Sequence, residues 1–355
     1  MDVRNPAHMS NENNHKKDRK IKVFLNPLFW GAVVFLFILS FFSGAYFGPG
    51  FLNKFDAENS EQIGINSQRQ KGNYKFINPL LECDYSQNIF SKNVVSMETK
   101  VKKDIEEIIR KGAAESVSLY YRDLNNGPWF GVNEDENYKP ASLLKVPIFM
   151  AYLKKIDNRM DLLSGTLSYN ENEIEMPEPA QQLETLNPNE EYSLETLFER
   201  MIIYSDNQAY ALLVNKIDSD NLDMVMQDLG MTLPTENGTE NILTAKSYAS
   251  LFRVLYNASY LSRNTSEYAL DLMSRVRYEK GLTNNLPEEI AVSHKFGLRR
   301  DTEVEGIVYL HDCGIIYYPE KPYLLCVMTK GKDYDKLTQI ISTLSSNIYQ
   351  QIKNQ

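Results

Sequence analysis

A serine and a lysine stand three residues apart in the stretch from Pro140 to Met150, as Ser142-Leu143-Leu144-Lys145. If this stretch is helical, both side chains lie on one face, because residues i and i+3 are neighbours on a helix surface. A serine needs a base within hydrogen-bond reach to act as a nucleophile. A lysine can be that base if burial or a nearby positive charge lowers its pKa. The spacing predicts a nucleophile beside its base, although Ser-x-x-Lys alone also occurs by chance in many helices.

Two further groups of polar residues bear on this serine. They are Ser205-Asp206-Asn207, at the end of an apolar helical segment, and His294-Lys295-Phe296-Gly297, in a strand-like segment. The ordered set of Ser-x-x-Lys, Ser-Asp-Asn and Lys-x-Gly resembles the penicillin-recognising serine hydrolases, which include class A β-lactamases and penicillin-binding D,D-peptidases. The resemblance covers roughly residues 96–355, and the spacings suit the class A branch.

The resemblance implies a role for each polar residue of the three motifs. Ser142 would be the nucleophile that forms an acyl-enzyme, and Lys145 would take or shuttle its proton. Ser205 would relay a proton towards the leaving nitrogen, and Asn207 would hold Lys145 and the substrate amide. Lys295 would keep the pKa of Lys145 low and attract a substrate carboxylate.

Backbone and neighbouring groups receive roles from the same resemblance. The backbone N–H groups of Ser142 and Leu298 would form an oxyanion hole, beside a substrate-binding Gly297. Asp206 is expected to orient its turn, and His294 is expected to pack in the interior.

Two departures from the family pattern affect the expected chemistry. The family usually has Thr or Ser between the lysine and the glycine of the third motif, whereas this chain has Phe296, which cannot donate a hydrogen bond to a substrate carboxylate. Arg299 or Arg300 could offer a bidentate contact instead. Class A enzymes also carry a loop glutamate that activates water for deacylation. The loop here lacks that pattern, and Glu236 and Glu240 are the candidates near the expected place.

Composition excludes several other classes of function. The chain has 355 residues, a net charge of −9 and a pI near 5.2, so nucleic acid is not an expected partner. Its four histidines include no H-E-x-x-H pair, and neither a metal nor a cofactor is expected. Its three cysteines, Cys83, Cys313 and Cys326, show no C-x-x-C spacing. Cys313 and Cys326 are expected on neighbouring strands as buried free thiols.

The amino-terminal residues indicate attachment to a membrane. Residues 1–27 are polar and locally basic, and residues 28–47 form about 20 residues without a charge, which matches a bilayer core. The basic flank predicts a cytoplasmic N-terminus and an extracytoplasmic remainder. An uncleaved signal anchor is preferred to a cleaved signal peptide, because the apolar run and its leader are long. Residues 48–95 are interpreted as a stalk, in which Phe76 to Leu81 could dock onto the folded domain.

The folded domain, expected at residues 96–355, is predicted to be α+β. The pattern is a helix, two strands near 116–123 and 128–132, a large helical insert, three strands from about 291 to 329, and a final helix. This order suggests an antiparallel five-stranded sheet flanked by terminal helices, with an all-helical lobe between the two groups of strands. Ser193 and Asp333 are expected to be the N-caps of helices, and Thr244 is expected just before another helix. A further helix is expected at about residues 265–275, and the first of the three late strands at residues 291–297.

The motifs lead to one preferred function and three alternatives. The preferred one is a membrane-anchored extracytoplasmic serine hydrolase, with Ser142 acylated by peptidoglycan D-alanyl peptides or β-lactams. The first alternative is a true β-lactamase that uses Glu236 or Glu240 for deacylation. The second is a catalytically weak or inactive peptidoglycan-binding module, which Phe296 and the missing loop glutamate favour. The third is an amidase or glutaminase-type relative. The sequence does not indicate the oligomeric state.

Overall fold

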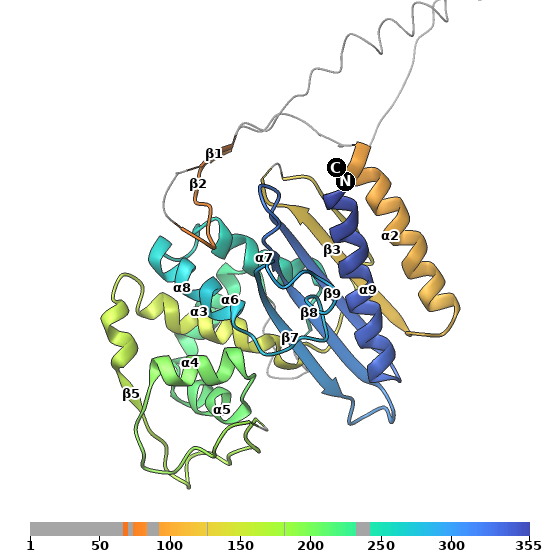
Figure 1. Cartoon of the computed structure of the whole chain (residues 1–355). Coiled ribbons are helices and arrows are strands. Elements are labelled where there is room, and N and C mark those ends of the chain that lie inside the picture. Colours follow the sequence, from red (N-terminus) through yellow and green to blue (C-terminus); the bar gives the residue numbers. More distant parts are fainter. Residues whose placement is uncertain (1–66, 70–73, 84–91, 126, 181, 232–241) are drawn as a thin grey trace, which may run out of the picture. The chain divides into compact units, whose positions relative to one another are not determined.

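The structure, a computed structural model, describes residues 67–69, 74–83, 92–125, 127–180, 182–231 and 242–355, which belong to one compact unit. Its largest sheet has five antiparallel strands in the order β4-β3-β9-β8-β7 (Figure 1). The strands are β3 (Ser116–Asp123), β4 (Trp129–Val132), β7 (Val292–Arg300), β8 (Val308–Ile316) and β9 (Tyr323–Gly331). The predicted α+β order, with two strands before the helical insert and three after it, is confirmed.

Two helices from opposite ends of the domain cover one face of this sheet (Figure 1). They are α2 (Lys92–Arg110) and α9 (Tyr334–Lys353). Each is amphipathic, and its apolar stripe is buried against the strands, as Met97 and Ile105 of α2 and Ile341 and Ile348 of α9 show.

The other face of the sheet carries the helical lobe. Its helices are α3 (Lys145–Lys155), α4 (Leu194–Ile203), α5 (Asn207–Lys216), α6 (Ser219–Asp228), α7 (Ala245–Tyr256) and α8 (Arg263–Ser274). Shorter elements are the 3₁₀ helices η1 (Ala141–Leu144) and η2 (Met160–Ser164) and the paired strands β5 (Thr166–Leu167) and β6 (Tyr192–Ser193). Helices α7 and α8 lie directly against the large sheet, and the remaining helices pack around α3.

Local capping signals explain where several helices begin. The side chains of Ser193, Thr244 and Asp333 accept backbone N–H groups at the starts of α4, α7 and α9, as expected. Helix α8 begins two residues before the expected Thr265, because Ser262 is its N-cap. Strand β7 extends three residues beyond Gly297, so the two candidate arginines, Arg299 and Arg300, are part of the sheet.

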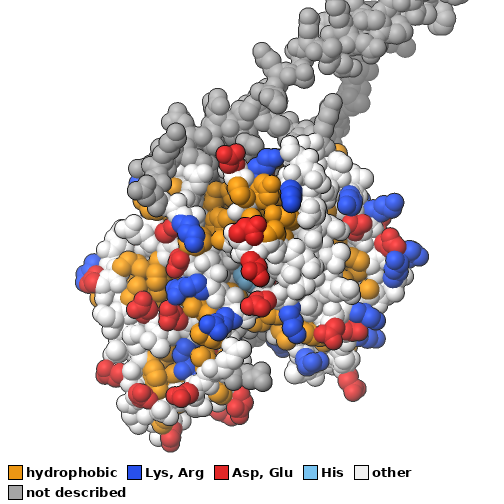
Figure 2. Space-filling model, viewed as in Figure 1, with side chains coloured by type: hydrophobic (Ala, Val, Ile, Leu, Met, Phe, Trp, Pro, Cys, Tyr) orange, Lys and Arg blue, Asp and Glu red, His pale blue; other side chains and the backbone are white. Residues whose placement is uncertain are grey.

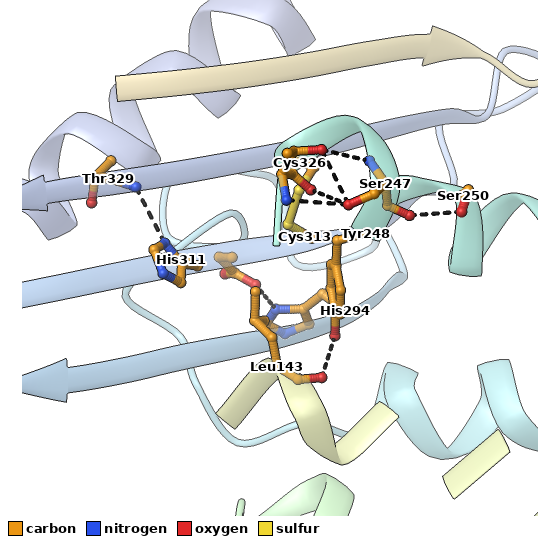
Figure 3. The surroundings of a disulfide bond; sticks show 11 residues. Leu143, Ser247, Tyr248, Ser250, His294, His311, Cys313, Cys326 and Thr329 are labelled. Carbon is orange, nitrogen blue, oxygen red and sulfur yellow. Dashed lines mark hydrogen bonds and ion pairs between the residues drawn. A yellow bond between two sulfur atoms is a disulfide. The ribbon is translucent and has the colours of Figure 1, made fainter. Parts of the chain in front are cut away.

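The prediction that Cys313 and Cys326 are free thiols is wrong, because the two residues form a disulfide (Figure 3). They stand directly opposite each other on β8 and β9, with their Cα atoms 3.9 Å apart. Both are fully buried on the face that α7 covers. The expected placement on neighbouring strands is correct, but the pairing depends on a strand register that spacing alone does not provide.

The segment from Lys75 to Asn78 packs on the folded domain, as expected for part of the predicted stalk. Phe76 and Ile77 are buried, and the Phe76 ring meets the Tyr317 ring edge to face. The Glu267 carboxylate of α8 accepts the backbone N–H groups of Lys75, Phe76 and Ile77 at 2.7–3.1 Å. On either side of this segment, β1 (Ser67–Arg69) and β2 (Leu80–Cys83) form a two-stranded antiparallel sheet.

Replacing Glu267 with alanine is expected to lower the free energy of unfolding by about 2 kcal/mol, because three backbone donors lose a charged acceptor. Glu267→Gln keeps one acceptor oxygen and should lose about half as much. Urea unfolding of the two variants beside the wild-type chain measures the difference. Equal stabilities of all three proteins would contradict this account of how the segment is held.

The described part of the chain contains no helix of the length and hydropathy that a membrane span requires. The predicted span, residues 28–47, lies outside the described residues, as does the basic tail, residues 1–27. The signal anchor therefore stays a prediction.

Candidate active site

The candidate nucleophile lies at the start of the central helix of the lobe. Ser142 is in η1, and Lys145 begins α3, which continues from η1 without a break. The Tyr248 hydroxyl of α7 donates a hydrogen bond to the Leu143 carbonyl at 3.0 Å and stabilises this turn (Figure 3). Ala141, just before the serine, has a φ of 52°, a conformation that non-glycine residues adopt at a cost. The backbone at the nucleophile is therefore held by its surroundings.

Lys145 makes contacts that suit a base for Ser142. Its Nζ lies 3.1 Å from Ser142 Oγ and 3.2 Å from Ser205 Oγ. It also lies 2.7 Å from both the Ser205 carbonyl oxygen and Asn207 Oδ1. These two oxygens can only accept, so a neutral amine gives them its two hydrogens and leaves its lone pair for a serine hydroxyl. The geometry orients Lys145 to take a proton from Ser142.

The pKa of Lys145 is lowered, as a base for Ser142 requires. Burial lowers its pKa to about 8, against a smaller opposing effect of Asp206. Burial also lowers the pKa of Lys295 well below its ordinary value, and the charge of Lys145 lowers it further. The resemblance implied that Lys295 keeps the pKa of Lys145 low, whereas here burial is the main cause.

The Ser205 hydroxyl lies between the two lysines. Lys295 Nζ is 3.0 Å from Ser205 Oγ, and Lys145 Nζ is 3.2 Å from the same atom. Ser205 has a φ of 58°, in the left-handed region, which places the hydroxyl and the carbonyl of one residue around Lys145. A hydroxyl with donors on both sides can pass a proton from one group to another.

Asp206 anchors the turn that carries Ser205 and Asn207. Its carboxylate is fully buried, and it accepts from Arg200 Nε at 2.7 Å, from the Ala180 N–H at 3.1 Å and from the Gln208 N–H at 3.3 Å. It is also the N-cap of α5. Asp206 therefore orients its turn, in agreement with the role expected from the sequence. The Asn207 side chain is exposed beyond its bond to Lys145.

Strand β7 approaches the nucleophile at Gly297. A Cβ atom here would lie 3.0 Å from the Pro140 carbonyl oxygen and 3.2 Å from the Leu143 N, so the absent side chain permits this close contact. Leu298, the second expected oxyanion donor, comes next on the strand. Side chains alternate along a strand, so Arg299 falls on the same face as Lys295, and Arg300 falls on the opposite face.

A comparison with known protein families shows the family to which this chain belongs. A protein-family model described as the beta-lactamase enzyme family matches residues 100–352. The chain belongs to the beta-lactamase enzyme family.

Solved structures with the same fold include β-lactamases and a protein named PBP-A. The TLA-1 extended-spectrum β-lactamase is 21% identical with a TM-score of 0.63, and the match covers 72% of this chain and 99% of that chain. PBP-A is 24% identical with a TM-score of 0.61, covering 72% and 97%. A β-lactamase from Sphaerobacter thermophilus is 22% identical with a TM-score of 0.62, covering 71% and 96%. Identities this low establish a shared fold and not a shared activity. No curated protein matches this chain significantly.

In this member of the beta-lactamase enzyme family, the Phe296 ring lies beside Lys295, whose Nζ is 4.2 Å from the ring centroid. Its ring stacks on Tyr278 with centroids 4.1 Å apart, on the sheet face that the terminal helices cover. Its carbonyl oxygen accepts from Lys295 Nζ at 3.0 Å. The ring takes the place of a hydroxyl and provides no hydrogen bond to a substrate carboxylate.

His294 has a buried partner of its own. Its Nδ1 lies 2.8 Å from Asp312 Oδ1, and Asp312 Oδ2 accepts the Leu282 N–H at 2.9 Å. These contacts match the interior packing expected for His294, which Figure 3 labels on its strand, and they link β7, β8 and the loop before β7. Among the described residues, no group of three or more His, Cys, Asp or Glu side chains is arranged to hold a metal ion.

Two predicted candidates cannot be located, and two supporting residues were not predicted. Glu236 and Glu240 lie outside the described residues. Sequence reasoning missed Arg200, which pairs with Asp206. It also missed Gln208, whose Oε1 accepts the Leu186 N–H and whose Nε2 donates to the Pro177 carbonyl. No local pattern marks either residue. Arg200 meets Asp206 across the turn between α4 and α5, at a spacing that no helix or strand repeat gives, and Gln208 meets partners 22 and 31 residues earlier in the chain.

Proposed function

We propose that this chain is a serine hydrolase that forms a covalent acyl-enzyme at Ser142 with β-lactams or peptidoglycan D-alanyl peptides. The observation that carries the proposal is the position of Lys145 Nζ, 3.1 Å from Ser142 Oγ, with its hydrogens directed to two carbonyl-type oxygens. The shared fold supports the proposal less than this contact does, because one fold can host many functions.

The reaction proceeds by transfer of the acyl group to serine. Ser142 Oγ attacks the carbonyl carbon and gives its proton to Lys145, while the negative oxygen is stabilised by the N–H groups of Ser142 and Leu298. The carbon–nitrogen bond then breaks, and the nitrogen receives a proton from Lys145 through Ser205. Water later cleaves the Ser142 ester and restores the serine.

The comparisons and the chemistry of the chain support this choice of substrate. One of the structures with a similar fold is an acyl-enzyme complex of a PBP-A mutant with penicillin G, at 24% identity and a TM-score of 0.62. Lys295 Nζ lies 3.0 Å from Ser205 Oγ, and a substrate carboxylate bound beside it would favour its charged form and offset the effect of burial.

The proposed location is the outer face of a membrane, with the chain anchored through residues 28–47. The Cys313–Cys326 disulfide supports it, because such bonds form and persist in oxidising compartments outside the cytosol. Figure 2 shows basic and acidic side chains mixed over the face in view, which suits neutral or zwitterionic peptides more than nucleic acid.

Incubation of the wild-type protein with a penicillin should add one penicillin mass at Ser142. Intact-mass spectrometry over time measures both the adduct and its lifetime. The Ser142→Ala variant removes the nucleophile and should show no adduct. An unmodified wild-type protein that still binds peptidoglycan, with or without Ser142, would instead support the inactive binding module.

The lifetime of the adduct separates the remaining alternatives. A long-lived adduct indicates a penicillin-binding peptidase, because a deacylating base is then missing. Rapid return to the free mass, with turnover of nitrocefin that depends on Glu236 or Glu240, indicates a β-lactamase. Hydrolysis of free glutamine would reveal the amidase alternative.

A further inference from the structure

Lys139 stands three residues before the nucleophile and takes no part in the three motifs. The backbone between the two residues lies against β7, since Gly297 meets the Pro140 carbonyl oxygen. The Lys139 carbonyl oxygen also accepts a hydrogen bond from His311 Nε2 of β8 at 2.9 Å. This end of the lysine is therefore held on the sheet.

The His311 ring is suited to keep this hydrogen bond to the Lys139 carbonyl at ordinary pH. It is fully buried, and burial lowers its pKa to about 4, so the ring is neutral at ordinary pH. Its Nδ1 accepts the Thr329 N–H at 3.3 Å, which leaves the hydrogen on Nε2 for the Lys139 carbonyl (Figure 3 shows the Thr329 contact).

The side chain of Lys139 reaches in the other direction, to the turn after β7. Its Nζ lies 3.3 Å from Asp301 Oδ2 and 3.1 Å from Glu303 Oε2. The lysine side chain is 17% exposed and that of Asp301 is 2% exposed, so water screens this pair far less than a surface pair.

Asp301 transmits this contact to the backbone of the turn. Its Oδ1 accepts the N–H groups of Glu303 and Val304 at 2.8 and 3.2 Å, and its own N–H donates to the Ile307 carbonyl at 2.8 Å. The carboxylate thus shapes the turn that joins β7 to β8, and Lys139 ties that carboxylate to the segment before Ser142.

We propose that Lys139 is a positioning residue that clamps the β7–β8 turn against the nucleophile segment and so fixes the spacing between the Ser142 and Leu298 N–H groups. The inference rests on the proposed function, because an oxyanion hole matters only if Ser142 is acylated. Loss of the clamp lets the end of β7 move away from Ser142 while leaving Lys145 and Ser205 in place. The step that suffers is then formation of the tetrahedral oxyanion.

The test is the rate of acylation of the full chain by a fluorescent penicillin, measured well below each variant's melting temperature. Lys139→Ala is expected to lower the limiting acylation rate about ten- to a hundredfold, with a smaller change in the penicillin concentration that half-saturates it. Lys139→Arg keeps the ion pair and should restore most of the rate. Asp301→Asn keeps the backbone contacts of the turn but weakens the ion pair, and should give an intermediate rate.

Lys154→Ala is the matched control. This half-buried lysine also joins two segments, through a 2.8 Å bond to the Tyr260 carbonyl, but it lies at the far end of α3. Its loss should lower the melting temperature without lowering the limiting rate. If Lys139→Ala behaves like this control, the clamp is only structural and the inference is wrong. A wild-type chain that forms no adduct overturns the proposed function instead, and the positioning role with it.

Discussion

Replacing Lys145 with alanine is expected to lower the acylation rate of Ser142 by about 10²- to 10⁴-fold, the usual contribution of a general base. The reason is the 3.1 Å contact between Lys145 Nζ and Ser142 Oγ. The measurement is the rate at which a fluorescent penicillin labels the variant compared with the wild-type protein. Lys145→Arg is the matched control, since it keeps the positive charge but cannot lose its proton at ordinary pH.

The pH dependence of the wild-type rate tests the same role. Only the neutral amine can accept the serine proton, and burial lowers the pKa of Lys145 to about 8. The rate should therefore be low below that pH, where the ammonium predominates, and should rise as the pH passes through it. A rate that stays constant from one unit below to one unit above this value would show that another group is the base.

Replacing Arg200 with methionine should give the second large effect, a loss of about 3 kcal/mol in the free energy of unfolding. The Asp206 carboxylate is 0% exposed, and Arg200 Nε is its cationic partner at 2.7 Å. Removing one partner of a buried ion pair leaves a buried charge uncompensated, which is strongly destabilising. Urea unfolding measures the loss. Acylation should slow as well, because Asp206 holds the turn that carries Ser205 and Asn207.

Two further variants test this explanation. Arg275→Met removes a surface arginine that contacts Glu199 and Asp271, and because its side chain is 45% exposed the loss should be below about 1 kcal/mol. Adding Asp206→Asn to Arg200→Met removes the stranded charge, so the double variant should regain part of the stability. A double variant that is less stable than Arg200→Met alone would show that the buried charge is not the cause.

Most of the secondary structure was predictable because its causes are local. The strand-like run of residues 116–123 and the N-cap signals of Ser193, Thr244 and Asp333 lie in or next to the elements that they define. The start of α8 was missed because Ser262, its N-cap, precedes the apolar pattern. The end of β7 was missed because its last three residues, Leu298 to Arg300, are held by pairing with β8 and are partly exposed.

The candidate site was predictable in its members but not in its electrostatics. The order of the three motifs selected Ser142, Lys145, Ser205, Asn207 and Lys295, and the structure brings the polar groups of these residues within hydrogen-bond distance of one another. The cause of the lowered pKa of Lys145 could not be read from the motifs, since burial depends on how the lobe packs against the sheet.

The sequence by itself determined the family, the order of helices and strands, and which side chains could react. Only the tertiary structure decided the Cys313–Cys326 disulfide, the contact of Lys139 with Asp301 and the packing of residues 75–77 on Glu267. The physical reason is the distance along the chain over which each feature acts. Periodicity and capping involve neighbours within a few residues, whereas strand register and buried ion pairs join residues that meet only when the sheet and the helical lobe close on each other.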